Sequence, residues 1–220
     1  MKLAFFGAFN PPTVAHLELA RFAREKTGAE QAVFVPSRAV YIREAQGKDY
    51  AYTDEQRLAM LRAAAEKRPW MAVTDWEMRQ ERQPRSYETL CHLREEEGGP
   101  VKLLMGSDKL PELEHGWKHV GDIAREFGFV CNGRGTDECE TMIREDPYLS
   151  TLAEYIEVVQ SSDLLRGVSS TGVRRRLSRI RALKREVQAL VPNEVLPLLD
   201  LEDENPSERW QINSAMNGRR

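Results

Sequence analysis

The residues best suited to chemistry lie in two short segments near opposite ends of the chain. The first, Gly7–His16, reads GAFNPPTVAH and combines small residues with a hydroxyl and an imidazole. The second, Val168–Arg174, reads VSSTGVR and combines three hydroxyls with a guanidinium. Each segment is predicted to run into a helix start, where free backbone N–H groups and the helix dipole favour anions. The pair therefore predicts one phosphate-bearing nucleotide held from both sides.

In the early segment, Thr13 and His16 are spaced by about one helical turn, so their side chains can point to the same side. An isolated histidine here is also explained by a hydrogen bond to a nearby carbonyl. Gly7, Ala8 and Phe9 form either an ordinary strand-to-helix turn or a turn that lets backbone N–H groups approach a phosphate, which only small residues permit. The chain has no G-x-x-x-x-G-K-[ST] sequence, so the turn is not a P-loop.

The late segment offers both helix caps and a cation. Ser169, Ser170 and Thr171 are good N-caps whatever the protein does, although capping explains one of them more easily than three in a row. Arg174 follows one turn later, and the guanidinium fork suits phosphate oxygens. Seven of the twelve residues over 174–185 are basic. No aromatic residue accompanies them, so we interpret Arg175–Arg185 as a solvated helix face rather than a nucleic-acid site.

Three further side chains follow strand-like segments. Trp76 and Trp117 are candidates for the core, the usual place of tryptophan. Both have polar neighbours, however, and a ring near the edge of a sheet can stack on a flat ligand. Asp108 either caps the next helix or accepts hydrogen bonds from nucleotide hydroxyls, as a carboxylate at a strand end can do.

Alternating apolar and helical patterns predict the elements that must position these residues. Gly28 ends one helical pattern, Thr53–Gln56 reads as a capping box, and Ser86 is predicted to cap a helix that ends at Gly98. Strands alternating with helices predict an α/β fold, a single doubly wound parallel sheet with ligands bound beyond the carboxyl ends of the strands. The six predicted strands are Leu3–Phe6, Ala32–Val35, Met71–Thr74, Val101–Met105, Gly128–Cys131 and Tyr155–Val159.

Length and local composition predict the domain organisation. A chain of 220 residues fits one domain. We predict a domain over residues 1–201 and a poorly ordered tail over residues 202–220, where Pro, Asn, Ser and charged residues replace any periodic pattern. Residues 37–52 are long and polar for a connection, and we expect a mobile loop on the substrate side there.

Composition excludes several classes of protein. The net charge of -3 gives no general attraction to nucleic acid or to a membrane surface. The apolar opening is too short for a signal sequence, and no later run reaches the length of a membrane span. Cys91, Cys131 and Cys139 contain no C-x-x-C pair, which predicts neither a disulfide framework nor a zinc cluster. We expect a cytoplasmic protein without a metal site built from its own side chains.

The two segments resemble a known superfamily. Thr13–His16 and Ser169–Arg174 are similar to the (H/T)-x-x-H and S-S-T-x-x-R motifs of nucleotidyltransferases with a Rossmann-like fold. More narrowly, the chain resembles the nicotinamide/nicotinate mononucleotide adenylyltransferases. The similarity continues, in the family's order, through Tyr52–Ala65, Val73–Glu77, Leu103–Asp108, Trp117-Lys118, Phe129–Cys131 and Val191-Pro192.

The resemblance also implies a site, residue by residue. His16 and Arg174 are the expected catalytic residues: His16 stabilises charge at the reacting phosphorus, while Thr171 and Arg174 bind the β- and γ-phosphates. Trp76 and Trp117 are expected to enclose the substrate ring. Arg43 or Lys48 is expected to neutralise the substrate phosphate. The expected ATP-binding set is Gly7, Ala8, Phe9, Thr13, His16, Gly106, Asp108, Ser170, Thr171 and Arg174.

The activity implied by the resemblance is transfer of AMP from ATP to nicotinate or nicotinamide mononucleotide, which yields deamido-NAD or NAD and pyrophosphate. Magnesium is expected to be held mainly by the ATP phosphates and water. Two alternatives stay open: a transferase of the same superfamily with another phosphorylated acceptor, and a module that binds nucleotide without turnover. The sequence does not decide between the acid and amide substrates. It is compatible with a homo-oligomer.

Overall fold

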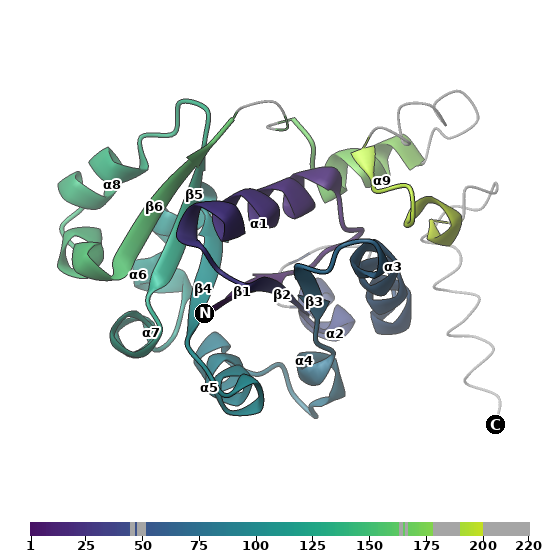
Figure 1. Cartoon of the computed structure of the whole chain (residues 1–220), viewed down its shortest axis with the longest axis horizontal. Helices are drawn as coiled ribbons and strands as arrows, with labels where there is room; N and C mark the ends of the chain where they lie inside the picture. The colour runs from purple at the N-terminus through teal and green to yellow at the C-terminus, as the bar shows by residue number, and fades with distance from the viewer. Residues whose placement is uncertain (45–46, 48–51, 163–164, 166, 178–189, 200–220) are drawn as a thin grey trace.

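A sheet of six parallel strands lies at the centre of the structure, in the order β3-β2-β1-β4-β5-β6 (Figure 1). The structure is a computed structural model that describes residues 1–44, 47, 52–162, 165, 167–177 and 190–199, and this strand count refers to them. Each predicted strand is confirmed. The strands are β1 (Lys2–Gly7), β2 (Gln31–Pro36), β3 (Met71–Val73), β4 (Val101–Gly106), β5 (Phe129–Arg134) and β6 (Ile156–Ser161).

The strand order reverses between β1 and β4. From β1 the chain adds β2 and β3 toward one edge of the sheet, and from β4 it adds β5 and β6 toward the other. This confirms the predicted doubly wound α/β fold. Sheets of this kind bind ligands beyond the carboxyl ends of the strands at the reversal point. Those ends are Gly7 and Gly106, and the early candidate segment begins at the first of them.

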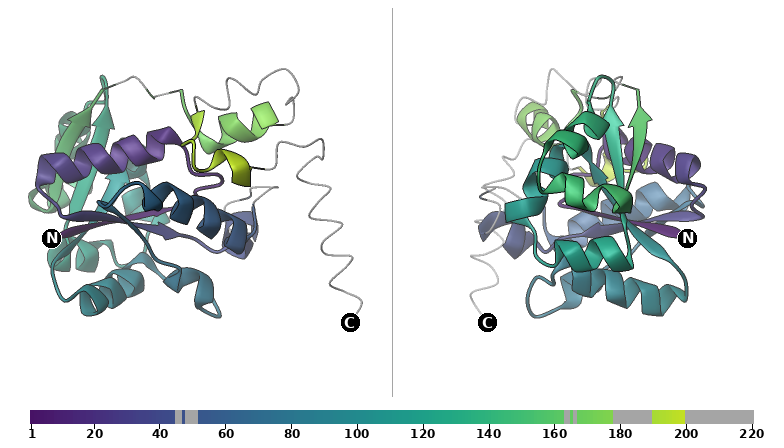
Figure 2. Two further views of the ribbon diagram at one scale, coloured as in Figure 1. Left: turned by 45° about the vertical axis from the view of Figure 1, so that its right-hand side comes forward. Right: turned by 90° about the vertical axis from the view of Figure 1, so that its left-hand side faces the viewer.

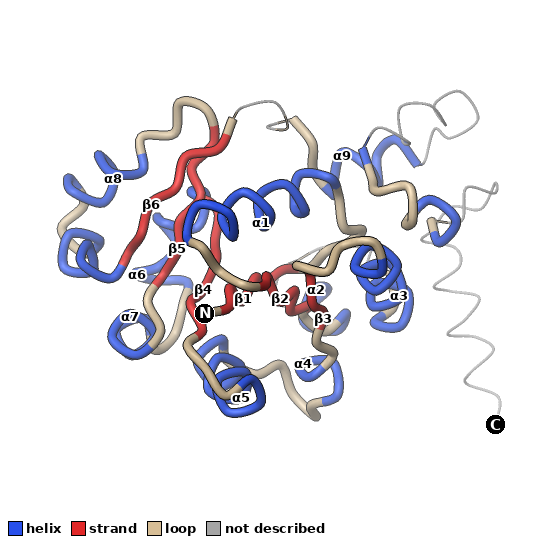
Figure 3. The backbone as a smooth tube through the Cα atoms, in the orientation of Figure 1, coloured by secondary structure: helices blue, strands red, loops and turns tan. Residues whose placement is uncertain are grey.

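Helices cover both faces of the sheet (Figures 2 and 3). The α-helices are α1 (Val14–Thr27), α2 (Ala39–Glu44), α3 (Asp54–Glu66), α4 (Trp76–Arg79), α5 (Ser86–Glu97), α6 (Leu113–Gly116), α7 (Val120–Glu126), α8 (Cys139–Glu145) and α9 (Ser170–Leu177). Short 3₁₀ helices are η1 (Ser107–Glu112), η2 (Leu149–Tyr155) and η4 (Leu196–Leu198).

The two faces of the sheet carry separate apolar clusters because side chains alternate along each strand. Leu3 and Phe5 of β1 pack on one face, in the cluster that includes residues of α1, α3 and α9. Ala4, between them, packs on the other face with residues of α5, α7 and α8. The helix α9, which carries the late segment, therefore lies on the same face as α1, which carries the early one.

Four helix boundaries were predicted from caps. Gly28 ends α1 and Gly98 ends α5, both in the left-handed conformation, with φ 66° and 62°, and Thr53 caps α3 within its capping box; these three predictions are confirmed. The prediction that Ser86 caps α5 is wrong by one residue. Arg85 is the N-cap, and its backbone N–H donates to Oε2 of Glu88 at 2.7 Å, so Ser86 is the first helical residue.

Residues 37–52 were predicted to be a loop, and this is wrong for Ala39–Glu44, which form α2. Two tertiary contacts stabilise this helix. The Ala39 N–H donates to Oδ1 of Asp54 at 2.7 Å, and the side chain of Ile42 is fully buried. The overall polarity of the segment hid this single apolar anchor and a cap supplied by another helix.

The predicted tail over residues 202–220 lies outside the described residues, as does the boundary at residue 201. No helix in the described part of the chain is both long and apolar enough to span a membrane.

Candidate active site

Thr13 and His16 meet in the first turn of α1. Thr13 is the buried N-cap, and its backbone N–H donates to Nδ1 of His16 at 3.0 Å, while its hydroxyl lies 2.9 Å from the same nitrogen. A backbone N–H can only donate, so Nδ1 is an acceptor and the proton of the neutral ring is on Nε2. The imidazole thus takes the place that Glu or Gln usually has in a capping box. The predicted proximity is confirmed, and Nδ1 accepts a hydrogen bond from a backbone N–H instead of donating one to a carbonyl.

The aromatic ring of Phe9 packs against the first turn of α1. Its ring is 1% exposed and packs against Phe5, Phe34 and His16, with the His16 ring centroid 5.3 Å away. A Cβ added to Gly7 would lie 2.9 Å from Cζ of Phe9. The need for glycine at residue 7 is therefore explained by the Phe9 ring, and the close approach of a phosphate, one of the two interpretations of this turn, stays a prediction. Because its ring is buried, only the backbone of Phe9 can meet a ligand.

The late segment lies directly against the early one. Ser170 Oγ donates to the Pro11 carbonyl at 2.8 Å, and one Arg174 nitrogen donates to the Asn10 carbonyl at 2.6 Å. The second Arg174 nitrogen lies 3.1 Å from the Thr171 hydroxyl. Figure 1 shows α9 beside one end of α1, and the bonds identify this as the N-terminal end. The prediction that the two segments face one another is confirmed.

A cavity of about 660 Å³ opens beside the β1 turn, the segment from Gly7 to Pro12 that connects β1 to α1. This volume is typical of small-molecule sites. Trp117 and Tyr41 contribute aromatic rings, and Arg85 and Lys118 contribute positive charge. Tyr41 and Arg85 were not among the site residues predicted from the sequence. The lining residues are Phe6, Gly7, Ala8, Ser37, Tyr41, Glu77, Gln83, Pro84, Arg85, Ser86, Lys109, Glu112, Gly116, Trp117 and Lys118.

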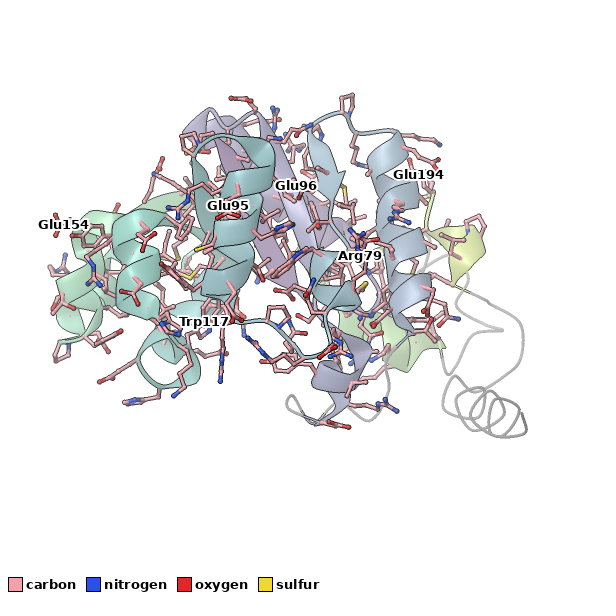
Figure 4. The ribbon with its side chains drawn as sticks, turned by 90° about the horizontal axis from the view of Figure 1, so that it is seen from below. Arg79, Glu95, Glu96, Trp117, Glu154 and Glu194 are labelled. Atoms are coloured by element: carbon pink, nitrogen blue, oxygen red, sulfur yellow. The ribbon has the colours of Figure 1, made fainter. Side chains whose placement is uncertain are left out.

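Trp76 occupies a different place from Trp117. It begins α4 and stacks on His92 of α5, with ring centroids 4.5 Å apart and an interplanar angle of 15°. Both rings line a second cavity of about 810 Å³, to which Arg79 also belongs. Figure 4 shows Trp117 and Arg79, one from each cavity, at separate places. The structure does not bring the two tryptophans together, so their joint enclosure of one ring stays a prediction.

Asp108 follows the carboxyl end of β4. Its side chain is 60% exposed and lies 3.7 Å from Lys109 Nζ and 3.8 Å from an Arg134 nitrogen. The N-cap of η1 is Gly106, so Asp108 is not the cap that one interpretation proposed. A Cβ on Gly106 would lie 2.5 Å from Oδ1 of Asp108, so glycine leaves room for the carboxylate. Contact with nucleotide hydroxyls remains a prediction.

Arg43 and Lys48 are the two basic residues expected to bind the substrate phosphate. Arg43 belongs to α2 and is half-buried, and it is not among the residues that line the first cavity. Lys48 lies outside the described residues.

Arg57 is a buried cation that the sequence analysis missed. Its side chain is fully buried in α3 and donates to the carbonyls of Ala8 at 2.6 Å, Tyr52 at 3.3 Å and Ser37. It also pairs with Oδ1 of Asp54 at 2.6 Å. Burial lowers the pKa of this guanidinium, while Asp54 favours its charged form. Since a peptide's C=O and N–H point in opposite directions, Arg57 turns the Phe9 N–H away from itself.

Glu77 is a buried carboxylate that was noted only as part of the family resemblance. It is 2% exposed and lies in the wall of the first cavity. The Thr89 hydroxyl donates to Oε1 at 2.7 Å and Gln83 Nε2 donates to Oε2 at 2.5 Å. Burial raises the pKa of Glu77 to about 7, although these two donors oppose the shift.

The donors around the β1 turn and α9 are N–H, O–H and guanidinium groups, which suit anions. Among the residues that the structure describes, no three His, Cys, Asp or Glu side chains are grouped so as to hold a metal ion.

Comparison with known proteins agrees with this geometry. A family model described as cytidylyltransferase-like matches residues 4–176, from β1 through the late segment. A probable nicotinate-nucleotide adenylyltransferase of Aquifex aeolicus is 32% identical over 126 residues, which are 57% of this chain and 72% of the relative. The chain belongs to the cytidylyltransferase-like family and, within it, to the nicotinate-nucleotide adenylyltransferases. The resemblance inferred from the two segments is confirmed.

Other relatives extend the similarity over most of the chain. A nicotinamide/nicotinic acid mononucleotide adenylyltransferase 2 of Caenorhabditis elegans is 27% identical over 216 residues, which cover 89% of this chain and 93% of the relative. The solved structure of a Plasmodium falciparum nicotinic acid mononucleotide adenylyltransferase complexed with APC superposes with a TM-score of 0.69 at 14% identity. It covers 90% of this chain and 93% of that one, and it shows that the fold is shared.

Proposed function

We propose that the protein transfers AMP from ATP to nicotinate or nicotinamide mononucleotide and releases pyrophosphate. The observation that carries the proposal is the contact between the early and late segments beside an aromatic-lined cavity. Arg174 and His16 bond to Asn10 and Thr13 in the segment that follows β1, and Gly7 and Ala8 of the same segment line the cavity together with Trp117. One turn thus borders both an anion site and a site for a flat ring.

The triphosphate of ATP is proposed to bind between the start of α1 and the start of α9, and we call this part of the site the phosphate side. The N–H groups after Gly7, the Nε2–H of His16 and the hydroxyl of Thr171 are hydrogen-bond donors, and the Arg174 fork adds a fixed positive charge. The mononucleotide is placed in the 660 Å³ cavity, where its ring contacts Trp117 and its phosphate meets Arg85 or Lys118. Both reacting phosphates then lie next to Gly7 and Ala8.

The reaction needs positioning more than acid–base chemistry. An oxygen of the acceptor phosphate attacks the α-phosphorus of ATP in line, a P–O bond forms, and the bond to the β-phosphate oxygen breaks. The second pKa of a phosphate monoester is about 6, so the nucleophile is largely ionised at neutral pH without a protein base. His16 and Arg174 stabilise the charge that develops on the transferred group and on pyrophosphate.

Magnesium fits this site as a complex with ATP. The surrounding side chains are donors, so the triphosphate oxygens and water are the groups that would hold the ion. When bound, magnesium neutralises part of the triphosphate charge. The cytoplasm, with its supply of ATP, is the proposed location of the reaction.

A pyrophosphate-release assay tests the proposal. The protein is given ATP and magnesium with nicotinate mononucleotide, nicotinamide mononucleotide or phosphopantetheine, and in a further arm CTP with a phospho-alcohol. Release with a pyridine mononucleotide supports the proposal, and the ratio of the two rates settles the choice of acid or amide. Release only with phosphopantetheine or CTP identifies another transferase, while ATP binding without release in every arm identifies a nucleotide sensor.

A further inference from the structure

Glu77 has no part in the chemistry proposed above, although it lies in the wall of the acceptor cavity. Both of its carboxylate oxygens accept hydrogen bonds, one from Thr89 and one from Gln83. A buried carboxylate weakens a fold unless its hydrogen bonds are satisfied, and even then a neutral replacement is often as stable. The position of Glu77 therefore points to a task other than stability.

Gln83 links Glu77 to the backbone in the cavity wall. Its Oε1 accepts the backbone N–H of Arg38 at 2.9 Å. The carbonyl on the other side of the same peptide unit, that of Ser37, accepts a hydrogen bond from Arg57. The peptide between Ser37 and Arg38 is thus held from both sides by buried charges, directly by Arg57 and through an amide by Glu77. Ser37 and Gln83 themselves line the cavity.

We propose that Glu77 is a positioning residue for the acceptor: through Gln83 it fixes the Ser37–Arg38 peptide in the wall of the mononucleotide cavity. This inference rests on the proposed function, which places the mononucleotide there. The phosphate side is held by different bonds, from Arg174 and Ser170 to the carbonyls of Asn10 and Pro11. Changes at Glu77 are therefore expected to alter use of the mononucleotide and to leave use of ATP nearly unchanged.

The ionisation of Glu77 provides a signature. Its pKa is raised to about 7 by burial. An ionised carboxylate binds the Gln83 amide more strongly than a protonated one, so we expect acceptor use to weaken as the pH falls through about 7. Glu112 is paired with Lys109 at 2.8 Å and Arg79 with Asp75 at 2.5 Å. The titratable and charged groups in the cavity wall are Tyr41, Arg85, Lys109, Glu112 and Lys118. The neighbouring segments add Arg38, Asp75, Arg79, Glu81, Arg82, Tyr87, Glu88, Cys91, His92, Arg94, Glu95 and Glu96.

The same pKa shift separates positioning from stability. The folded chain binds this proton more tightly than the unfolded chain, so the stability due to Glu77 is lost as the pH rises from 4.5 to about 7. Above that range the buried charge weakens the fold. Glu77→Gln removes the charge, and the new amide can accept from Gln83 and donate to the Thr89 hydroxyl. We therefore expect its Tm near pH 8.5 to equal or exceed that of the original chain.

Steady-state kinetics with both substrates, between about pH 6 and pH 8.5, test the proposal. Gln83→Ala is expected to raise the KM for the mononucleotide roughly 5- to 20-fold and the KM for ATP less than about 2-fold. Gln80→Ala is the matched control, because Gln80 lies in the same loop and its side-chain Nε2 donates to the Trp76 carbonyl at 3.0 Å. We expect it to behave like the original chain.

Glu77→Gln is expected to raise the KM for the mononucleotide roughly 3- to 10-fold near pH 8.5. Near pH 6 we expect the KM of the variant to be about equal to that of the original chain. The double variant is expected to be no worse than Gln83→Ala alone. Equal changes in both KM values, a ratio of variant to original KM that is independent of pH, additive effects or a lower Tm of Glu77→Gln near pH 8.5 would each overturn the proposal. An unmodified chain that uses neither pyridine mononucleotide overturns the proposed function as well, so the two failures are distinguishable.

Discussion

The proposed phosphate side and the proposed acceptor side of this site are built in different ways. On the phosphate side, side chains from two segments bond directly to backbone groups: Ser170 donates to the Pro11 carbonyl, Arg174 donates to the Asn10 carbonyl, and His16 accepts the Thr13 N–H. On the acceptor side, a cavity of about 660 Å³ has walls from many elements, and the Ser37–Arg38 peptide in its wall is bonded by Arg57 and by Gln83, which in turn bonds Glu77.

This difference follows from what each side must do. A triphosphate presents the same charges in every reaction cycle, and preformed donors can stabilise it without rearrangement. A mononucleotide must be distinguished from other phosphorylated molecules, and that requires a shaped cavity. Substitutions on the phosphate side are therefore expected to reduce turnover, and substitutions on the acceptor side to change substrate use.

The strongest test of this contrast is His16→Gln. Glutamine is a natural capping-box residue at this helix position, so it can accept the Thr13 N–H in place of Nδ1. It lacks the imidazole Nε2–H, and turnover is expected to fall roughly 10²- to 10³-fold with a nearly unchanged Tm. Turnover rates and thermal melts of Gln and Ala variants check this. Near-normal turnover of the Gln variant would make His16 a cap only.

Arg174→Lys tests geometry against charge on the phosphate side. Lysine keeps the charge but cannot reach Asn10 and Thr171 together, so kcat/KM for ATP is expected to fall by about 1.5–3 kcal/mol, roughly 10- to 150-fold. Arg175→Lys on the exposed side of the same helix is the control. Similar losses in both variants would show that the charge of the helix, rather than the Arg174 fork, supports ATP binding.

Trp117→Ala and Trp76→Ala compare the two cavities. Loss of the Trp117 ring is expected to weaken mononucleotide use by about 1–3 kcal/mol, with little change in the KM for ATP. Loss of the Trp76 ring removes its stack on His92 and is expected to lower the Tm more than it changes either KM. Kinetics and melts of both variants check this. Equal increases in mononucleotide KM would mean that Trp76 leaves His92 when the enzyme works.

The smallest expected effect concerns Ser169. Its hydroxyl accepts the Gly172 N–H at 3.1 Å, which caps α9, whereas Thr171 contacts Arg174. Ser169→Ala is expected to cost about 1 kcal/mol of stability and to leave the KM for ATP unchanged. Thr171→Ala is expected to raise the KM for ATP and to leave the stability nearly unchanged. Denaturant unfolding and ATP kinetics of the pair check whether the hydroxyls divide into cap and ligand.

The phosphate side could be predicted from the sequence because its parts are local. Thr13 and His16 are three residues apart at a helix start, and Ser170, Thr171 and Arg174 share one turn. The fold followed from apolar strands separated by helical patterns. The contact between Ser170 and Pro11, however, spans 159 positions, and only the assumption of a shared ligand connected them.

The acceptor side could be predicted much less well because its residues are brought together by packing. Arg57 left one usable signal: it shares the buried side of α3 with Met60, Leu61 and Ala64, where a charge is unexpected. Glu77 has no such pattern, since its burial depends on Gln83 and Thr89 from outside its own helix. Trp76 was predicted to lie in the site because its neighbours in the sequence are polar. Those neighbours give no sign of His92, on which the Trp76 ring stacks.

The close fit between Gly7 and Phe9 also limits the order in which this turn can change over generations. With alanine at residue 7, its Cβ would lie 2.9 Å from the Phe9 ring, which is enclosed by Phe5, Phe34 and His16, and such overpacking costs about 1–3 kcal/mol. A smaller residue 9 relieves this clash but leaves a void beneath the His16 ring. A single substitution at either position is therefore expected to be destabilising, which makes the two positions epistatic. We expect a lineage that changes one of them to change the other as well.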